Sequence, residues 1–204
     1  MNGAVAHHKA KGFTLIEVLV AIVVLSFGML GMVGMQAFAL QANRDARIQT
    51  QAVVLARDLA EMMRGNKVVS TKTTAATNPY LGSFSSPLTL ATPSYCLNTS
   101  NAGTGCTSIT DIASAEMTDW LARVDAELPG ARIVVCLDGV PYDSEGLPKW
   151  DCTPSSANEI IAIKIGWTRN STDRSKTGSA VLEKTSDSNS RPYIIFPVTS
   201  GSIV

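Results

Sequence analysis

The sequence predicts an α+β fold in which one long N-terminal helix carries a small antiparallel β-sheet, with loops tied together by disulfides. Three observations predict it. No charged residue occurs between Glu17 and Arg44, helical periodicity continues beyond that stretch, and short β-branched or alternating segments recur after residue 130. A chain of 204 residues has room for one domain with its own core in addition to such a helix.

The apolar stretch has the length of a membrane-spanning helix. Residues 18–43 are 26 uncharged residues, and at 1.5 Å rise per residue they make about 39 Å of helix, more than the ~30 Å of a hydrocarbon core. Lys9 and Lys11 precede the stretch, so this end is expected to stay in the cytoplasm. Because Ala37-Phe38-Ala39 resembles a signal-peptidase site, a removable secretory signal is the alternative.

Helical character continues beyond the apolar stretch. Apolar residues recur there at steps of four and three, which is one stripe of an amphipathic helix: Ile48, Ala52, Leu55, Leu59 and Met62. Gly65-Asn66 is the predicted C-terminal stop of this helix. The sequence therefore predicts one helix over residues 13–64, with an apolar part at 13–43 and an amphipathic part at 44–64 that packs on the sheet.

Residues 65–204 are expected to form a globular exported domain. Residues 68–105 are rich in Thr, Ser, Asn, Pro and Gly, which predicts a long surface connection. A second helix is predicted over residues 111–128, capped by Asp111 or Thr110 and ended by Pro129-Gly130.

Four segments are candidate strands of one antiparallel sheet. They are residues 131–137, 159–167, 179–183 and 193–198. Residues 159–167 alternate, with isoleucines on one face and Ala162, Lys164 and Gly166 on the other. The apolar face of the sheet is expected to pack against the amphipathic part of the long helix.

The four cysteines all lie downstream of the apolar stretch, at Cys96, Cys106, Cys136 and Cys152. An even number in a part that would be exported fits disulfides, whereas a zinc site of four thiolates is disfavoured because no CxxC spacing is present. Four cysteines allow three connectivities. Pairing of neighbours, Cys96 with Cys106 and Cys136 with Cys152, needs the smallest loop closures, and each bond would contribute about 2–4 kcal/mol.

The start of the apolar stretch carries a specific motif. The string Gly12-Phe13-Thr14-Leu15-Ile16-Glu17 resembles the processing site of type IV prepilins and type II secretion pseudopilins. The resemblance implies that a prepilin peptidase removes residues 1–12 by cutting between Gly12 and Phe13, and then methylates the Phe13 amine. The longer string over residues 12–21, together with residues 28–31 and 55–66, is most similar to PilV-type minor pilins. The fold of that family is a helical spine with a small antiparallel sheet.

Glu17 is expected to have a function or a charged partner, because placing a carboxylate at the centre of a bilayer costs about 2.5–3.5 kcal/mol of free energy, and less near an interface. After cleavage the free amine of Phe13 lies four residues earlier, about one helical turn away. Glu17 is therefore expected to pair with the N-terminal amine of a neighbouring subunit and to favour one axial register. The alternative is that Glu17 only complements the positive end of the helix dipole.

The composition argues against several other functions. Both histidines, His7 and His8, lie in the leader, so the mature chain has none for a Ser-His-Asp or Cys-His mechanism. Removing the leader leaves 15 basic residues against 17 acidic ones, a balance that does not predict nucleic-acid binding. We expect no enzyme activity, catalytic residue, cofactor, metal or small-molecule substrate. A calcium site in the acidic loop at 138–146 is the one metal alternative, because oxygen ligands on a flexible loop suit that ion.

The resemblance implies a structural function, that of a minor pilin of a type IV pilus. Such a subunit waits in the inner membrane as a single-pass protein and then joins major and other minor pilins near the tip of an extracellular filament. There it helps to start assembly and so supports cell adhesion and twitching motility. The alternatives are a minor pseudopilin of type II secretion, which shares the N-terminal motif, and a tip adhesin or other binding module.

Overall fold

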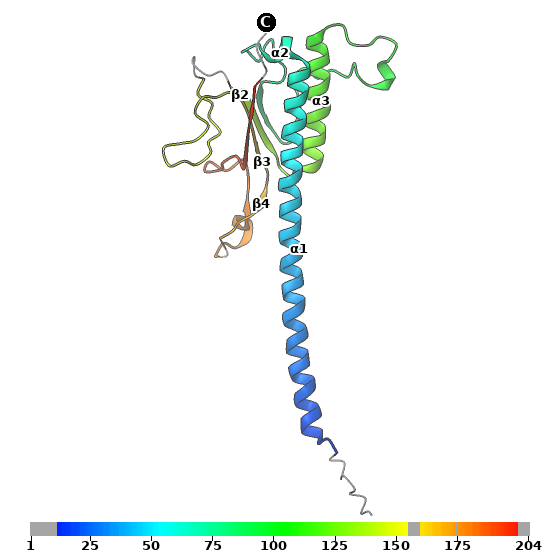
Figure 1. Ribbon diagram of the computed structural model, residues 1–204, viewed down its shortest axis with the longest axis vertical. Coiled ribbons are helices and arrows are strands. Elements are labelled where there is room, and N and C mark those ends of the chain that lie inside the picture. Colours follow the sequence, from blue (N-terminus) through cyan, green and yellow to red (C-terminus); the bar gives the residue numbers. More distant parts are fainter. Residues whose placement is uncertain (1–11, 155–159, 174, 200–204) are drawn as a thin grey trace, which may run out of the picture. The chain divides into compact units, whose positions relative to one another are not determined.

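The structure is a computed structural model that describes residues 12–154, 160–173 and 175–199. The chain divides into two compact units, Met1–Asp45 and Ala46–Val204. The longest element, α1 (Leu15–Gly65), begins in the first unit and ends in the second (Figure 1). Its observed bounds are close to the predicted ones of 13 and 64.

The described part of the first unit is mainly an apolar helix whose side chains are exposed. All of its residues from Gly12 to Asp45 are exposed, including large apolar side chains such as Leu15 (93% exposed) and Phe27 (71% exposed). Burying a side chain of this size is worth about 1.5–3 kcal/mol, so this surface is unstable in water. The helix needs lipid or other protein chains around it.

In the second unit, α1 contributes one face to the core. Its buried residues are small or apolar: Ala52, Leu55, Ala56, Leu59, Ala60 and Met63. The predicted stripe was therefore close but slightly rotated, because Ile48 and Met62 are only partly buried. The helix α3 (Ile109–Glu127) packs beside it, and the buried Trp120 indole N–H donates to the Leu55 carbonyl at 2.9 Å.

The start of α3 corrects the prediction for the second helix. The helix begins at Ile109, two residues earlier than predicted, and its cap is Ser108 rather than Asp111 or Thr110. The Ser108 hydroxyl accepts a hydrogen bond from the Asp111 N–H at 3.1 Å, which satisfies one of the free donors of the first turn. The predicted end is confirmed: the helix stops before Pro129-Gly130, where Gly130 has a positive φ of 57°.

The main sheet is antiparallel with strand order β1-β2-β3-β6. Its strands are β1 (Gly82–Ser85), β2 (Arg132–Leu137), β3 (Ile161–Gly166) and β6 (Ile194–Val198). One face carries Ile133, Ile163 and Ile165, which belong to the same core as α1 and α3. In Figure 1 the two helices lie together on that side of the sheet.

Two predictions about the strands were wrong. Residues 68–105 are not only a surface connection: they include a short helix, α2 (Lys67–Ser70), a 3-10 turn, η1 (Thr99–Asn101), and the edge strand β1. Residues 179–183 do not join the main sheet. They form the 3-10 turn η2 (Gly178–Val181) and β5 (Leu182–Glu183), which pairs with β4 (Arg169–Asn170) in a separate two-stranded sheet.

The connection before β1 is fixed to α3 by a buried tyrosine. The Tyr80 hydroxyl donates a hydrogen bond to the Glu116 carboxylate, and Tyr80 itself is fully buried. Burial raises the pKa of Tyr80, and the neighbouring Glu116 carboxylate raises it further. Asn78, also fully buried, donates to the Lys72 carbonyl at 2.9 Å. These contacts explain why a segment of polar composition is ordered.

Both faces of β3 are buried, whereas the sequence predicts one covered face and one that carries Lys164. All six residues of β3 are buried. The second face is covered by the loop between β2 and β3, where the Trp150 ring lies against Gly166 so closely that a Cβ there would be 2.9 Å from it. The Lys164 side chain is fully enclosed on this face.

Candidate functional site

The predicted processing site lies where the first helix begins. Gly12, Phe13 and Thr14 precede α1 outside any helix or strand, and residues 1–11 of the predicted leader lie outside the described part of the chain. The Thr14 carbonyl accepts hydrogen bonds from the N–H groups of Glu17 (3.1 Å) and Val18 (3.3 Å), which closes the first turn. The bond between Gly12 and Phe13 therefore lies just outside the regular helix.

Phe13 and Glu17 lie beside each other at this end of α1. Together with four apolar residues of the next two turns they line a shallow recess of about 420 Å³. Glu17 is the acidic residue of the first turn, where it faces the positive end of the helix dipole. Both predicted roles of Glu17, the pairing with a neighbour's amine and the interaction with the helix dipole, need a carboxylate in this first turn.

The same helix has the length and composition of a membrane span. Within α1, an 18-residue window reaches a mean hydropathy of 2.5, and none of that window is buried. A buried core helix of a soluble protein passes the same test, but no described residue of this chain covers the window. The position near the N-terminus would also suit a signal sequence, so the motif at Gly12–Glu17 is needed to distinguish the two.

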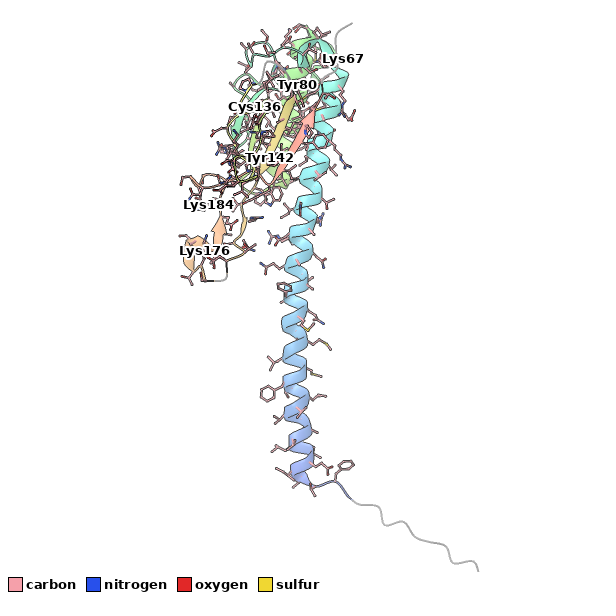
Figure 2. All side chains as sticks on the ribbon, turned by 60° about the vertical axis from the view of Figure 1, so that its left-hand side comes forward. Lys67, Tyr80, Cys136, Tyr142, Lys176 and Lys184 are labelled. Atoms are coloured by element: carbon pink, nitrogen blue, oxygen red, sulfur yellow. A yellow bond between two sulfur atoms is a disulfide. The ribbon has the colours of Figure 1, made fainter. Side chains whose placement is uncertain are left out.

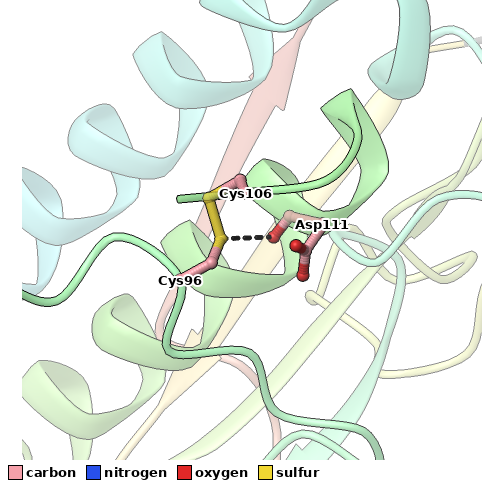
Figure 3. Close-up of side chains that lie close together, drawn as sticks. All are labelled: Cys96, Cys106 and Asp111. Atoms are coloured by element: carbon pink, nitrogen blue, oxygen red, sulfur yellow. Dashed lines mark hydrogen bonds between the residues drawn. A yellow bond between two sulfur atoms is a disulfide. The ribbon is translucent and has the colours of Figure 1, made fainter. Parts of the chain in front are cut away.

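The first disulfide joins Cys96 to Cys106 and closes a loop in front of α3 (Figure 3). Asp111 holds both ends of that loop: its carboxylate accepts hydrogen bonds from the Ser94 hydroxyl at 2.6 Å and from the Thr107 N–H at 3.0 Å. These donors, the Ser94 hydroxyl first, lower the pKa of Asp111. Asp111, predicted as a helix cap, therefore anchors the disulfide loop.

The second disulfide joins Cys136, at the end of β2, to Cys152. Both bonds are the neighbour pairs that the loop-closure argument favours. Inside the loop that this bond closes, the Lys164 ammonium lies 2.5 Å from the Asp138 carboxylate, and both side chains are fully buried. The ammonium also donates to the carbonyls of Lys149 at 2.8 Å and Asp151 at 2.7 Å.

Two carboxylates of the acidic loop at 138–146, for which calcium binding was the alternative to a solvated turn, face donors of the chain itself. Burial raises the pKa of Asp138, but the Lys164 ammonium and the N–H groups of Thr153 and Val140 outweigh burial, so the net pKa is lowered. Asp143 accepts from the Leu147 N–H at 2.9 Å and pairs with Arg191 at 2.7 Å, which also lowers its pKa.

Among the described residues, two groups have the composition of a metal site. Each consists of the two sulfurs of one disulfide and one aspartate, Asp111 or Asp138. A metal ligand must be a thiolate, and these sulfurs are bonded to each other. In Figure 3 the Cys96 sulfur lies against the backbone carbonyl of Asp111, at 3.7 Å. The arrangement is that of a covalently tied loop.

The pairing of Lys164 with Asp138 was not predicted. A lysine in an alternating strand is normally on the solvent side, and the sequence around Asp138 reads as a turn. One signal was available: the lysine interrupts a strand that is otherwise apolar or small on both faces. Such a strand is typical of a sheet that is covered on both sides, so its lysine needs a buried partner.

The comparisons with known proteins match two adjoining parts of the chain. The family model described as type IV pilin Tt1218 matches residues 34–118, and the prokaryotic N-terminal methylation motif matches residues 7–33. Neither the curated proteins nor the solved structures gave a match.

The two matched families agree with the geometry of the N-terminus. The methylation motif covers the Gly12–Phe13 bond and most of the exposed apolar helix. It implies processing by a prepilin peptidase and assembly with other pilins, and pilins are structural subunits. The chain is therefore a type IV pilin-like protein, anchored in the membrane by its apolar N-terminal helix before it assembles into an extracellular pilus.

Proposed function

We propose that this chain is a minor pilin, most similar to the PilV type, which joins the filament near its tip and helps to start its assembly. A leader of residues 1–12 is removed between Gly12 and Phe13, and Phe13 becomes the methylated N-terminus. Residues 13–43 then form the membrane and filament part, residues 44–64 carry the domain, and residues 65–204 are the exported domain. The division of the chain after Asp45 supports this organisation.

One observation carries the proposal: a long apolar helix surface on which no residue is covered. Every described residue up to Arg47 is exposed, and Glu17 is the only charged one before Arg44. Such a surface is stable in lipid and, outside lipid, in a bundle of similar helices. In that bundle the Glu17 carboxylate meets the Phe13 amine of a neighbour, and their attraction favours one axial register because both charges are largely desolvated.

The variant Glu17→Ala tests this role. It keeps the apolar surface and the cleavage site, so processing and membrane insertion are expected to stay near wild type while the amount recovered in sheared pili falls. Asp45→Ala is the matched control, because it removes one carboxylate from the same exposed helix outside the apolar part. Equal recovery of the Glu17→Ala and Asp45→Ala chains in pili would refute the pairing.

A deletion strain separates the minor-pilin function from its alternative. Loss of surface pili and of twitching motility, with restoration by the wild-type chain, is the expected result. The ratio of this chain to the major pilin in purified filaments should be far below one if the subunit acts near the tip. Normal piliation together with a defect in protein secretion would instead identify a type II secretion pseudopilin.

A further inference from the structure

Two adjoining hollows open beside the main sheet and the two-stranded sheet of β4 and β5. The first, of about 430 Å³, is lined by Arg132, Lys149, Trp150, Asp151 and neighbouring residues. The second, of about 390 Å³, is lined by cations and acids of the region around β4 and β5. They share one wall, residues 188–191. Figure 2 shows Lys176 and Lys184, which line the second hollow, close to each other at the lower left of the picture.

The floor of the first hollow is fixed by hydrogen bonds from below. The Trp150 indole N–H donates to the Ser190 hydroxyl at 3.2 Å, and that hydroxyl donates to the Thr185 carbonyl at 2.7 Å. Beneath the ring, the buried Lys164 ammonium holds the backbone on both sides of Trp150. Trp150 is only 9% exposed. The hollow is therefore formed before any ligand enters, which reduces the entropic cost of binding.

Arg132 lies over this floor without an acidic partner. Its guanidinium is 4.5 Å from the centre of the Trp150 ring, and no carboxylate of the described residues lies within 4.0 Å of it or of the Lys149 ammonium. The Lys149 ammonium donates one hydrogen bond, to the Thr153 hydroxyl at 3.3 Å. A stacked guanidinium with free N–H donors fits a planar carboxylate with two parallel hydrogen bonds.

The charges around both hollows favour an anionic ligand. Six cations line them, against three acids. The cations are Arg132, Lys149, Arg169, Lys176, Lys184 and Arg191, and the acids are Asp151, Glu183 and Asp187. Two of the cations already have carboxylate partners, because Arg169 pairs with Glu183 at 3.0 Å and Arg191 pairs with Asp143 at 2.7 Å. Four cations (Arg132, Lys149, Lys176 and Lys184) and two acids (Asp151 and Asp187) of the lining have no such ion pair among the described residues. The mature chain as a whole would carry a small negative charge, so the positive potential is local to this face.

We propose that these two hollows bind an acidic polysaccharide. A uronic-acid carboxylate pairs with Arg132 and Lys149 in the first hollow, while hydroxyl groups of the sugar meet Ser188 and Asn189 on the shared wall. The next acidic unit reaches the cations of the second hollow. A hollow of this volume suits a ligand of one or two sugar rings, and two adjoining ones suit a chain.

A single-stranded nucleic acid fits this face less well. Such strands gain much of their affinity by stacking bases on exposed aromatic rings. Here the Trp150 ring is almost completely buried under Arg132, and the guanidinium of Arg169 lies 4.1 Å from the centre of the Tyr193 ring. In each hollow a guanidinium therefore occupies a ring face on which a base would stack.

The test is a titration of the full mature chain in detergent micelles with fluorescently labelled oligogalacturonate. Saturable binding is expected, with no binding of a neutral maltooligosaccharide of equal length. Arg132→Gln should weaken the affinity about tenfold, which corresponds to one charge-assisted contact. Lys149→Gln, whose side chain makes one exposed contact, should weaken it in the same direction and serves if the first variant does not fold.

Arg57→Gln is the matched control, because it removes the same charge from an exposed position on α1; its affinity should stay within about twofold of wild type. An equal loss in that variant would reduce the effect to overall charge and overturn the site. Absence of saturable oligogalacturonate binding, or tighter binding of a single-stranded DNA of equal charge, would also overturn it. None of these outcomes alters piliation of the deletion strain, so the proposed minor-pilin function is tested separately.

Discussion

The substitution Lys164→Met tests how much the buried Lys164–Asp138 pair contributes to stability and to fixing the loop between β2 and β3 (the outer loop) on the sheet. It keeps most of the apolar stem of the side chain and removes the ammonium. In the wild type that ammonium pairs with Asp138 at 2.5 Å, both side chains being fully buried, and it also binds two backbone carbonyls. The variant leaves a buried carboxylate without its cation.

The expected loss of unfolding free energy is large. Breaking a buried ion pair from one side typically costs about 3–5 kcal/mol. Asp138 keeps hydrogen bonds from the N–H groups of Val140 (3.0 Å) and Thr153 (3.1 Å), so we expect the lower end of that range. Arg123→Met is the matched control. Its pair with Asp58 is 49% and 37% exposed, and exposed pairs contribute about 0–1 kcal/mol.

The loss should also depend on pH with a defined sign. In the wild type the pKa of Asp138 is below its ordinary value of 3.8, so its contribution is complete above that value and is lost as the pH falls through the lower folded pKa. Without Lys164, the group that opposes burial most strongly is gone, so we expect the pKa of Asp138 in the folded variant to rise above that of the unfolded chain. The folded variant then binds a proton more readily than the unfolded chain, and its stability deficit shrinks as the pH falls towards 4.

Urea denaturation at pH 7 and at pH 4.5, followed by tryptophan fluorescence of the full chain in micelles, measures both effects. A Lys164→Met loss below about 1 kcal/mol at pH 7, equal to that of Arg123→Met, would refute the claim that this pair organises the loop. A deficit that is unchanged between the two pH values would refute the assignment of the effect to a buried Asp138 charge.

Two further predictions concern α3 and the outer loop. Ser108→Ala should lower the unfolding free energy by about 0.5–2 kcal/mol, because it removes the cap of α3, whereas Ser108→Asp should retain most of it; urea midpoints of the two variants check this. Opening the Cys136–Cys152 bond with the double Cys→Ser variant should cost about 2–4 kcal/mol by the loop-entropy model. A parallel titration with oligogalacturonate should then show weaker binding, because the segment that carries Trp150 is no longer tied to β2.

The long helix and the two central strands were predictable because their signals are local. The apolar stretch, the stripe from Ala52 to Leu59 and the stop at Gly65 lie within a few residues of what they specify. The alternation of β3 likewise identified the isoleucines that pack on the helices. The cysteine pairing followed from short loop closures.

The remaining features depend on contacts between distant segments. The strand β1 has only Phe84 as a large apolar residue, and it exists because it pairs with β2. Lys164 is buried because a loop some fifteen residues earlier folds back over the sheet and offers carbonyls to it. Arg132 and Trp150 belong to different elements, and only the fold brings them together. Periodicity within one segment carries no information on such pairs.

The apolar helix is expected to stay on the mature protein after a cut between Gly12 and Phe13. Mass spectrometry of the intact chain, recovered from pili and from membranes of the same cells, tests it most directly. We expect a polypeptide that begins at Phe13, carries one extra methyl group at its amine and keeps both disulfides. A chain that begins after Ala39, with the apolar helix removed, would contradict it.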